Sequence, residues 1–217
     1  MSDVIVQPAI EPVTLAEAKL RLEEIDSVHD SFITMLIGSA RMYAEGYCNR
    51  SFITQTRRMT LDAFPSPYSN LLDSSYRYAA NAPVGFTGGC ITLNRGPVIS
   101  VSSIVYVDAD GTTVTVTSPT TPAYNIDLSG HGGRITPGYG QSWPIARRQM
   151  AAVKVNYIAG YGPLAADVPL GIRNWILLRV STLFQNREEV AVLPRGSVSA
   201  LPYVDCLLDD FIAYRSS

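Results

Sequence analysis

The sequence has few of the residue types that enzyme chemistry most often uses. Among its 217 residues are 2 His and 3 Cys, and only Lys19 and Lys154 are lysines. No HExxH motif and no paired Cys/His spacing occurs, so no zinc-site motif is present. Neither Lys follows a Gly, which excludes a Walker P-loop. The three cysteines are odd in number and far apart, which argues against a disulfide framework: Cys48, Cys90 and Cys206.

Long apolar runs and a charge imbalance are also missing. No apolar run reaches the roughly 18–20 residues that a membrane helix needs. The 17 basic and 19 acidic residues leave a formal net charge of -2, which does not suit a general nucleic-acid binder or a polybasic membrane anchor. The first residues lack the basic start and apolar core of a signal peptide. We therefore expect a soluble protein of intracellular type with no membrane association.

The remaining candidates for chemistry are weak. Residues 140–144, GQSWP, have Pro where a nucleophile elbow has its second Gly. The Gly-rich run at 130–134 is typical of a tight turn between strands, and His29 and His131 are interpreted as surface or capping residues. Adjacent carboxylates on helices point about 100° apart and form no ready dyad. We expect a protein that is not an enzyme and has no cofactor and no metal.

Residues 1–50 predict an extended arm followed by two helices. Thr14 and Glu17 have the spacing of a capping box at the start of the first helix. The second helix is expected to begin near residues 27–30 and to end near 48–49, with an apolar stripe at helical spacing. Eight acidic and four basic residues give this zone a charge of -4.

Residues 51–166 predict a β-rich region. The clearest signal lies at 100–116, where two β-branched runs flank a turn ending in Gly111. Further short strands are expected within 53–64, 90–94 and the segments YNIDL, GRITP and AVKVNYIAGY. Residues 65–89 are rich in Pro, Gly, Ser and Tyr and are interpreted as a long exposed loop that contacts a partner. Eight basic and five acidic residues give this zone a charge of +3.

Residues 167–217 predict two more helices. Asp167 is expected to be the N-cap of the first, with Pro169 in its first turn. The last helix is expected near 202–214. The order helix, β, helix predicts an α+β fold, in which the N- and C-terminal helices form one bundle and the antiparallel β region is inserted between them, all within one structural unit.

Ordered motifs along the chain resemble one family. PVTLAEAKLRL and ARMYAEGYCNRSFITQT open the pattern, and NRGPVISVSSIVYVDADGT with GRITPGYGQSWPIARRQMAAVKVNYIAGYG continues it. ADVPLGIRNWILLRVSTLFQNREEV ends it, so the blocks lie within residues 12–190. In this order they resemble the head-tail connector (adaptor) proteins of long-tailed double-stranded DNA phages and gene transfer agents.

The resemblance implies a structural role in the virion. Members of that family form a ring, usually of twelve subunits, below the portal protein, where the ring extends the DNA channel and joins the capsid to a stopper or tail-side neck protein. DNA passes through without sequence-specific binding. The resemblance carries no catalytic residue, and it implies manufacture in the host cytoplasm. The segment 65–89 departs from the family, in which the connection is commonly shorter.

Contact residues follow from the charge pattern and from the resemblance. A ring requires contacts between unlike faces of identical subunits, and the acidic and basic zones supply such faces. Candidate subunit or partner contacts are Arg57, Arg58, Arg147, Arg148, Tyr76 and Tyr78. The resemblance places portal contacts in the C-terminal segment, with Arg195, Tyr203, Phe211, Tyr214 and Arg215 as candidates.

Two alternatives stay open at this point. The chain can be another neck protein, a stopper or a tail terminator, although such proteins are expected to be mainly β. It can also be a β-rich binding module for carbohydrate or protein that uses the tyrosines of residues 65–89 for stacking.

Overall fold

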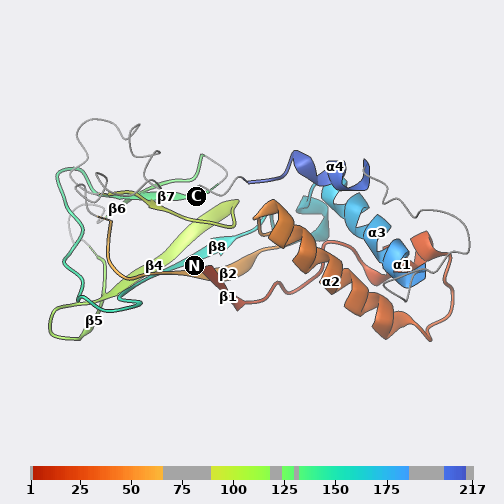
Figure 1. The fold of residues 1–217 in the computed structure, drawn as a ribbon, viewed down its shortest axis with the longest axis horizontal. Helices are drawn as coiled ribbons and strands as arrows, with labels where there is room; N and C mark the ends of the chain where they lie inside the picture. The colour runs from red at the N-terminus through yellow and green to blue at the C-terminus, as the bar shows by residue number, and fades with distance from the viewer. Residues whose placement is uncertain (1, 66–88, 118–123, 130–131, 186–202, 214–217) are drawn as a thin grey trace, which may run out of the picture. The chain divides into compact units, whose positions relative to one another are not determined.

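The computed structural model describes residues 2–65, 89–117, 124–129, 132–185 and 203–213, with the backbone alone at 203–205. Helices and antiparallel sheets make up these residues, which confirms the α+β class (Figure 1). The chain divides into two compact units, each with its own core. The β unit combines residues 2–7 and 55–160, and the helical unit combines residues 8–54 and 161–213, in both cases as far as they are described.

The helical unit contains four α-helices and a short 3-10 helix among its described residues. They are α1 (Leu15–Leu22), α2 (Asp30–Cys48), η3 (Ala165–Asp167), α3 (Leu170–Gln185) and α4 (Tyr203–Asp209). Within this unit α3 contacts α1, α2 and α4 (Figure 1). The buried side chains between them include Ile33, Ile37, Ala44, Phe52, Ile172, Trp175, Ile176 and Leu208. Burial of this apolar surface is the main stabilising contribution to the unit.

The first two helices form where the sequence predicted them. The side-chain oxygen of Thr14 accepts a hydrogen bond from the Glu17 backbone N–H, and Glu17 accepts in return from the Thr14 N–H at 2.8 Å. The capping box is confirmed. Helix α2 buries most of its predicted apolar stripe, although Tyr47 is exposed. The helix ends at Cys48, and the C-cap Asn49 adopts the left-handed conformation that is frequent at helix ends.

The prediction that Asp167 caps α3 is wrong. Asp167 is the last residue of η3, and its carboxylate accepts a hydrogen bond at 2.8 Å from the Leu164 backbone N–H, which precedes it. The carbonyl of Pro169 instead accepts the first bonds of α3, from the N–H groups of Ile172 and Arg173. Because Asp167 belongs to the 3-10 turn that precedes α3, its carboxylate bonds at the start of that turn and not at the α3 N-terminus. Helix α4 is shorter than the predicted 202–214.

Two antiparallel sheets form the β unit. The larger has the order β1 (Ser2–Val6), β2 (Gln55–Leu61), β8 (Val153–Ala159), β4 (Val98–Val107), β5 (Thr113–Thr115). The smaller has the order β3 (Ile91–Thr92), β7 (Arg134–Pro137), β6 (Tyr124–Asp127). Alternate residues of β8, from Val153 to Ala159, are buried and share one core with Ile91 and Ile135 of the smaller sheet.

The hairpin from β4 to β5 confirms the strongest β prediction. Asp108 accepts hydrogen bonds from the backbone N–H groups of Asp110, at 3.0 Å, and Thr112, at 2.8 Å. Gly111 has a φ of 90°, a conformation that glycine adopts without steric cost. The N-terminal arm, by contrast, is a strand, because β1 pairs with β2 from Ser2 opposite Met59 onward. Within the described residues, no helix is long and apolar enough to cross a membrane.

Candidate interaction surfaces

Burial and hydrogen bonding shift the pKa of several titratable groups among the described residues. Burial raises the pKa of the Cys48 thiol to about 11, and burial also raises the pKa of Cys90. Hydrogen bonds from Ser129 and Arg134 lower the pKa of the exposed Asp127 carboxyl to about 2. Each shift moves the pKa of its group further from neutral pH. No group of His, Cys, Asp or Glu within this part of the chain could hold a metal ion.

Arg57 and Arg58 occupy adjacent positions of β2 and therefore point to opposite faces of the sheet. The Arg57 side chain is buried, and its Nη2 donates to the Ser2 carbonyl at 3.3 Å, so it ties β1 to β2. Arg58 is half-buried and donates to Asn156 at 2.8 Å, and Asn156 donates to the Ser103 hydroxyl at 2.8 Å. These three side chains form a polar row across β2, β8 and β4. Of the two arginines, Arg58 is the one with surface accessible to a partner.

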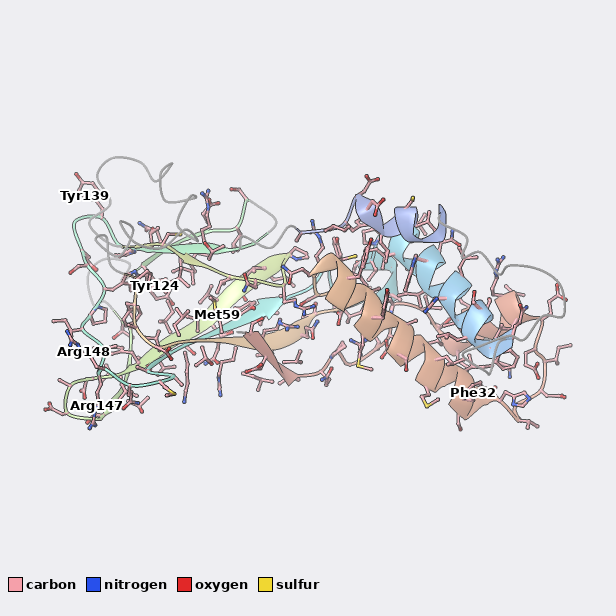
Figure 2. The ribbon with its side chains drawn as sticks, viewed as in Figure 1. Phe32, Met59, Tyr124, Tyr139, Arg147 and Arg148 are labelled. Carbon is pink, nitrogen blue, oxygen red and sulfur yellow. The ribbon has the colours of Figure 1, made fainter. Side chains whose placement is uncertain are left out.

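Arg147 and Arg148 lie in the connection between β7 and β8, and both are exposed (Figure 2). The Arg147 backbone N–H donates to the Val107 carbonyl at 2.9 Å, at the end of β4. Its guanidinium lies against the β4–β5 turn, where a Cβ on Gly111 would come within 2.6 Å of Nη1. The backbone of this pair is therefore anchored while both side chains face solvent.

The same connection exposes apolar side chains that the sequence analysis did not select. Ile145 and Met150 are each 88% exposed, and Tyr139 is 99% exposed. Between them Trp143 is buried, stacks on Phe64 with ring centroids 4.9 Å apart, and donates from Nε1 to the Gly89 carbonyl at 2.7 Å. An anchored backbone that holds large apolar side chains in water is a feature of interaction surfaces.

A second exposed apolar group lies in the helical unit, at the end of α1 and in its connection to α2. Leu20 is 82%, Ile25 93% and Val28 81% exposed. Glu23 and Asp26 of this connection are exposed as well. None of these residues belongs to the apolar stripes of α1 and α2. Large apolar residues at positions outside the helical spacing of these stripes are the sequence signal that could have identified this exposed group.

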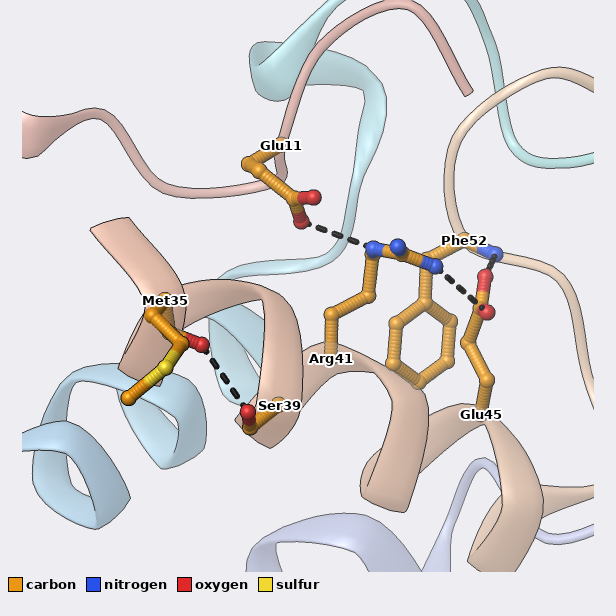
Figure 3. Close-up of polar contacts among 6 residues, drawn as sticks. All are labelled: Glu11, Met35, Ser39, Arg41, Glu45 and Phe52. Carbon is orange, nitrogen blue, oxygen red and sulfur yellow. Dashed lines mark hydrogen bonds and ion pairs between the residues drawn. The ribbon is translucent and has the colours of Figure 1, made fainter. Parts of the chain in front are cut away.

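A buried ionic network joins the segment before α1 to α2 (Figure 3). Arg41 Nε lies 2.7 Å from Glu11 Oε2, and Arg41 Nη1 lies 2.9 Å from Glu45 Oε2. The other oxygen of Glu45 accepts the Phe52 backbone N–H at 2.8 Å. On the same helix the Ser39 hydroxyl donates to the Met35 carbonyl at 2.9 Å. The network fixes three chain segments of the helical unit to one another.

The other predicted contact residues fall mostly outside the described residues. Phe211 is half-buried and packs against Gly171 of α3, where a Cβ would come within 3.1 Å of its ring. His29 stands at the N-cap position of α2 without a side-chain capping bond. The structure describes no side chain at the following positions: Tyr76, Tyr78, His131, Arg195, Tyr203, Tyr214 and Arg215.

Solved structures with the same fold come from gene transfer agent (GTA) particles. A chain of the virion of a native GTA particle matches with a TM-score of 0.73 and 18% identity, over 99% of this chain and 96% of that one. A chain of the neck of an empty GTA particle, computed with C6 symmetry, matches with a TM-score of 0.72 at the same identity and coverage. The neck of a native GTA particle, computed with C12 symmetry, gives 0.60, also at 18% identity, 99% and 96%.

The similarity to these chains is one of fold, and it extends over nearly the full length of both compared chains. Neither a protein-family model nor a curated protein matches the sequence.

Proposed function

We propose that the chain is a structural component of the neck of a tailed particle, a phage or a gene transfer agent. In this role it is a head-tail adaptor that joins the capsid to the tail. The single observation that carries the proposal is the fold shared with chains of GTA virions and necks over 99% of this chain. The order of motifs over residues 12–190, found independently in the sequence, supports the same role.

The adaptor forms a ring, which we propose has twelve copies. The symmetries used for the related necks, C6 and C12, support a ring with six-fold or twelve-fold symmetry. In such a ring each subunit presents two unlike faces, one to each neighbour. Arg58, Arg147 and Arg148 are the described arginines that remain candidates for these contacts.

The proposed partners are the portal protein on the capsid side and a stopper or tail-side neck protein on the other. The C-terminal segment, with Arg195, Tyr203, Phe211, Tyr214 and Arg215, is the proposed portal contact. DNA passes through the ring without sequence-specific recognition. A net charge of -2 suits a channel through which DNA moves without being held, because DNA affinity grows with the number of phosphates that a protein neutralises. The role is structural and uses no cofactor.

Deletion of the gene in a particle-producing strain tests the proposal. We expect capsids that carry no tails, because the link between the two is missing, and free tails in the same lysate. Expression of the intact chain from a second locus should restore tailed particles. Fully assembled, tailed particles in the deletion strain would contradict the role.

A further inference from the structure

Two exposed surfaces of the chain have complementary composition. The acidic patch consists of Leu20, Glu23, Ile25, Asp26 and Val28, in the helical unit. The basic patch consists of Ile145, Arg147, Arg148 and Met150, in the β unit. Figure 2 labels its two arginines. Each patch combines two kinds of side chain. The large apolar ones are more than four-fifths exposed, and the charged ones are all of one sign.

The charge difference is clear over the two segments. Residues 20–28 carry one Arg and three acidic residues, a net charge of -2, and residues 144–150 carry two Arg and no acidic residue, a net charge of +2. Asp108 and Asp110 lie in the β4–β5 turn, against which the Arg147 guanidinium lies. Asp108 is engaged by the N–H groups of Asp110 and Thr112, and neither carboxylate forms an ion pair with an arginine among the described residues.

The backbone under the acidic patch is held in place. The Lys19 ammonium donates to the Asp26 carbonyl at 2.8 Å and to the Asp30 carboxylate at 2.7 Å, which closes the connection between α1 and α2. The Glu24 N–H donates to the Lys19 carbonyl at 3.1 Å, and Glu23 adopts the left-handed conformation that ends α1. Ile25 and Val28 are thus presented to solvent by a fixed turn.

The backbone under the basic patch is held as firmly. Trp143 anchors its start and the Arg147 N–H bonds to the Val107 carbonyl. At its end, the Ala151 N–H donates to the Asp62 carboxylate at 2.9 Å. Surfaces that are ordered before they bind lose less conformational entropy on association. Both patches therefore have the properties of preformed contact surfaces.

We propose that the acidic patch of one copy of this chain binds the basic patch of the next copy. This inference rests on the proposed ring, for which it names the contact between neighbouring subunits. The occupant is a second copy because the two surfaces that match each other in charge and apolar content belong to the same chain. DNA phosphates match the two arginines but leave Ile145 and Met150 in water. A contact between unlike patches repeats around a ring, whereas a contact between like patches stops at a dimer.

Chemical crosslinking in assembled particles tests the contact directly. The test chain carries Ile25→Cys and Ile145→Cys, with Cys206→Ser to remove the exposed native thiol. A short bis-maleimide should give a ladder of covalent multimers on a denaturing gel. The matched control has Cys206→Ser alone, which should give none. A chain with the two added cysteines that stays at monomer mass, or crosslinks only within itself, would overturn the proposal.

Charge reversal provides the second test, with tailed-particle yield as the readout. Arg147→Glu with Arg148→Glu, and separately Glu23→Arg with Asp26→Arg, should each lower the yield at least about tenfold, because like charges then face each other. All four reversals in one chain should recover most of the yield. Lys154→Glu changes an exposed charge outside both patches and should leave the yield unchanged. Far-UV circular dichroism confirms that each variant folds.

The outcomes separate this contact from the role on which it rests. If the chain is present in the particle neck but reversals at either patch behave like Lys154→Glu, the contact is wrong and the adaptor role stands. If the quadruple variant fails as badly as the double variants, the pairing of these two patches is wrong. If purified particles do not contain the chain, both proposals fall.

Discussion

At the scale of single residues, Arg41 is a buried charge on which the helical unit depends. It is 6% exposed and contacts two carboxylates, Glu11 and Glu45, from different parts of the chain. A buried charge whose partner is removed is left uncompensated, and its cost exceeds that of losing an exposed pair. Arg41 therefore contributes to folding through the arrangement of its partners, and it has no role in the proposed contacts.

We predict that Arg41→Ala lowers the free energy of unfolding of the helical unit by about 3 kcal/mol, since Glu45 stays buried without its ion-pair partner. Urea unfolding followed by circular dichroism measures the loss. The control is Lys19→Ala, which removes a more exposed pair with Asp30 and should cost less than about 1 kcal/mol. Equal losses in the two variants would contradict the account of the network.

Residue-level contacts were only partly predictable from the sequence. Arg41 and Glu45 are four residues apart, a spacing that brings side chains together on a helix. Glu11 lies 30 residues before Arg41 in the sequence and joins the pair only through tertiary packing. The same limit applies to Arg57, whose burial depends on the pairing of β1 with β2.

At the scale of elements, local signals predicted local structure. The capping box of α1 and the β4–β5 turn each depend on residues within four positions of one another, and both formed as predicted. The N-terminal strand was missed because its partner lies more than 50 residues away. Asp167 was assigned to the wrong helix. An Asp at this point in the sequence can bond at the start of either of two consecutive helical segments, η3 and α3, and only packing determines which of them it joins.

The connection between β7 and β8 was not predicted as a contact surface beyond its two arginines. Ile145 and Met150 looked like ordinary apolar residues in the sequence, and nothing local distinguishes an exposed one from a buried one. In the structure Trp143 occupies the core position of this connection, and Ile145 and Met150 remain exposed.

We predict that Trp143→Ala loosens this connection, since it removes the stacking on Phe64 and the bond to Gly89 at a cost of about 3 kcal/mol. Limited trypsin digestion should then cleave after Arg147 or Arg148 several times faster than in the unchanged chain. Cleavage after Arg58, within β2, serves as the control and should change less. Equal acceleration at both places would show unfolding of the whole unit and contradict a local anchor.

At the scale of the whole molecule, the distribution of charge says more than its sum. The net charge of -2 divides into -4 over residues 1–50, +3 over 51–166 and -1 over 167–217. The proposed subunit contact uses one surface from the acidic zone and one from the basic zone. A chain organised in this way can assemble through its own opposite charges while its net charge keeps its attraction for DNA low.

Fold class was within reach of the sequence because it depends on the order of elements along the chain. The contact surfaces were not, since they are made by side chains that packing leaves exposed.

The most direct test of the central claim is a cryo-electron microscopy map of the neck of an intact particle that contains this chain. The account predicts density for the chain as a closed ring between capsid and tail, with twelve copies and the basic patch of each subunit against its neighbour. A neck in which no density fits this fold, or a location elsewhere in the particle, would contradict the account.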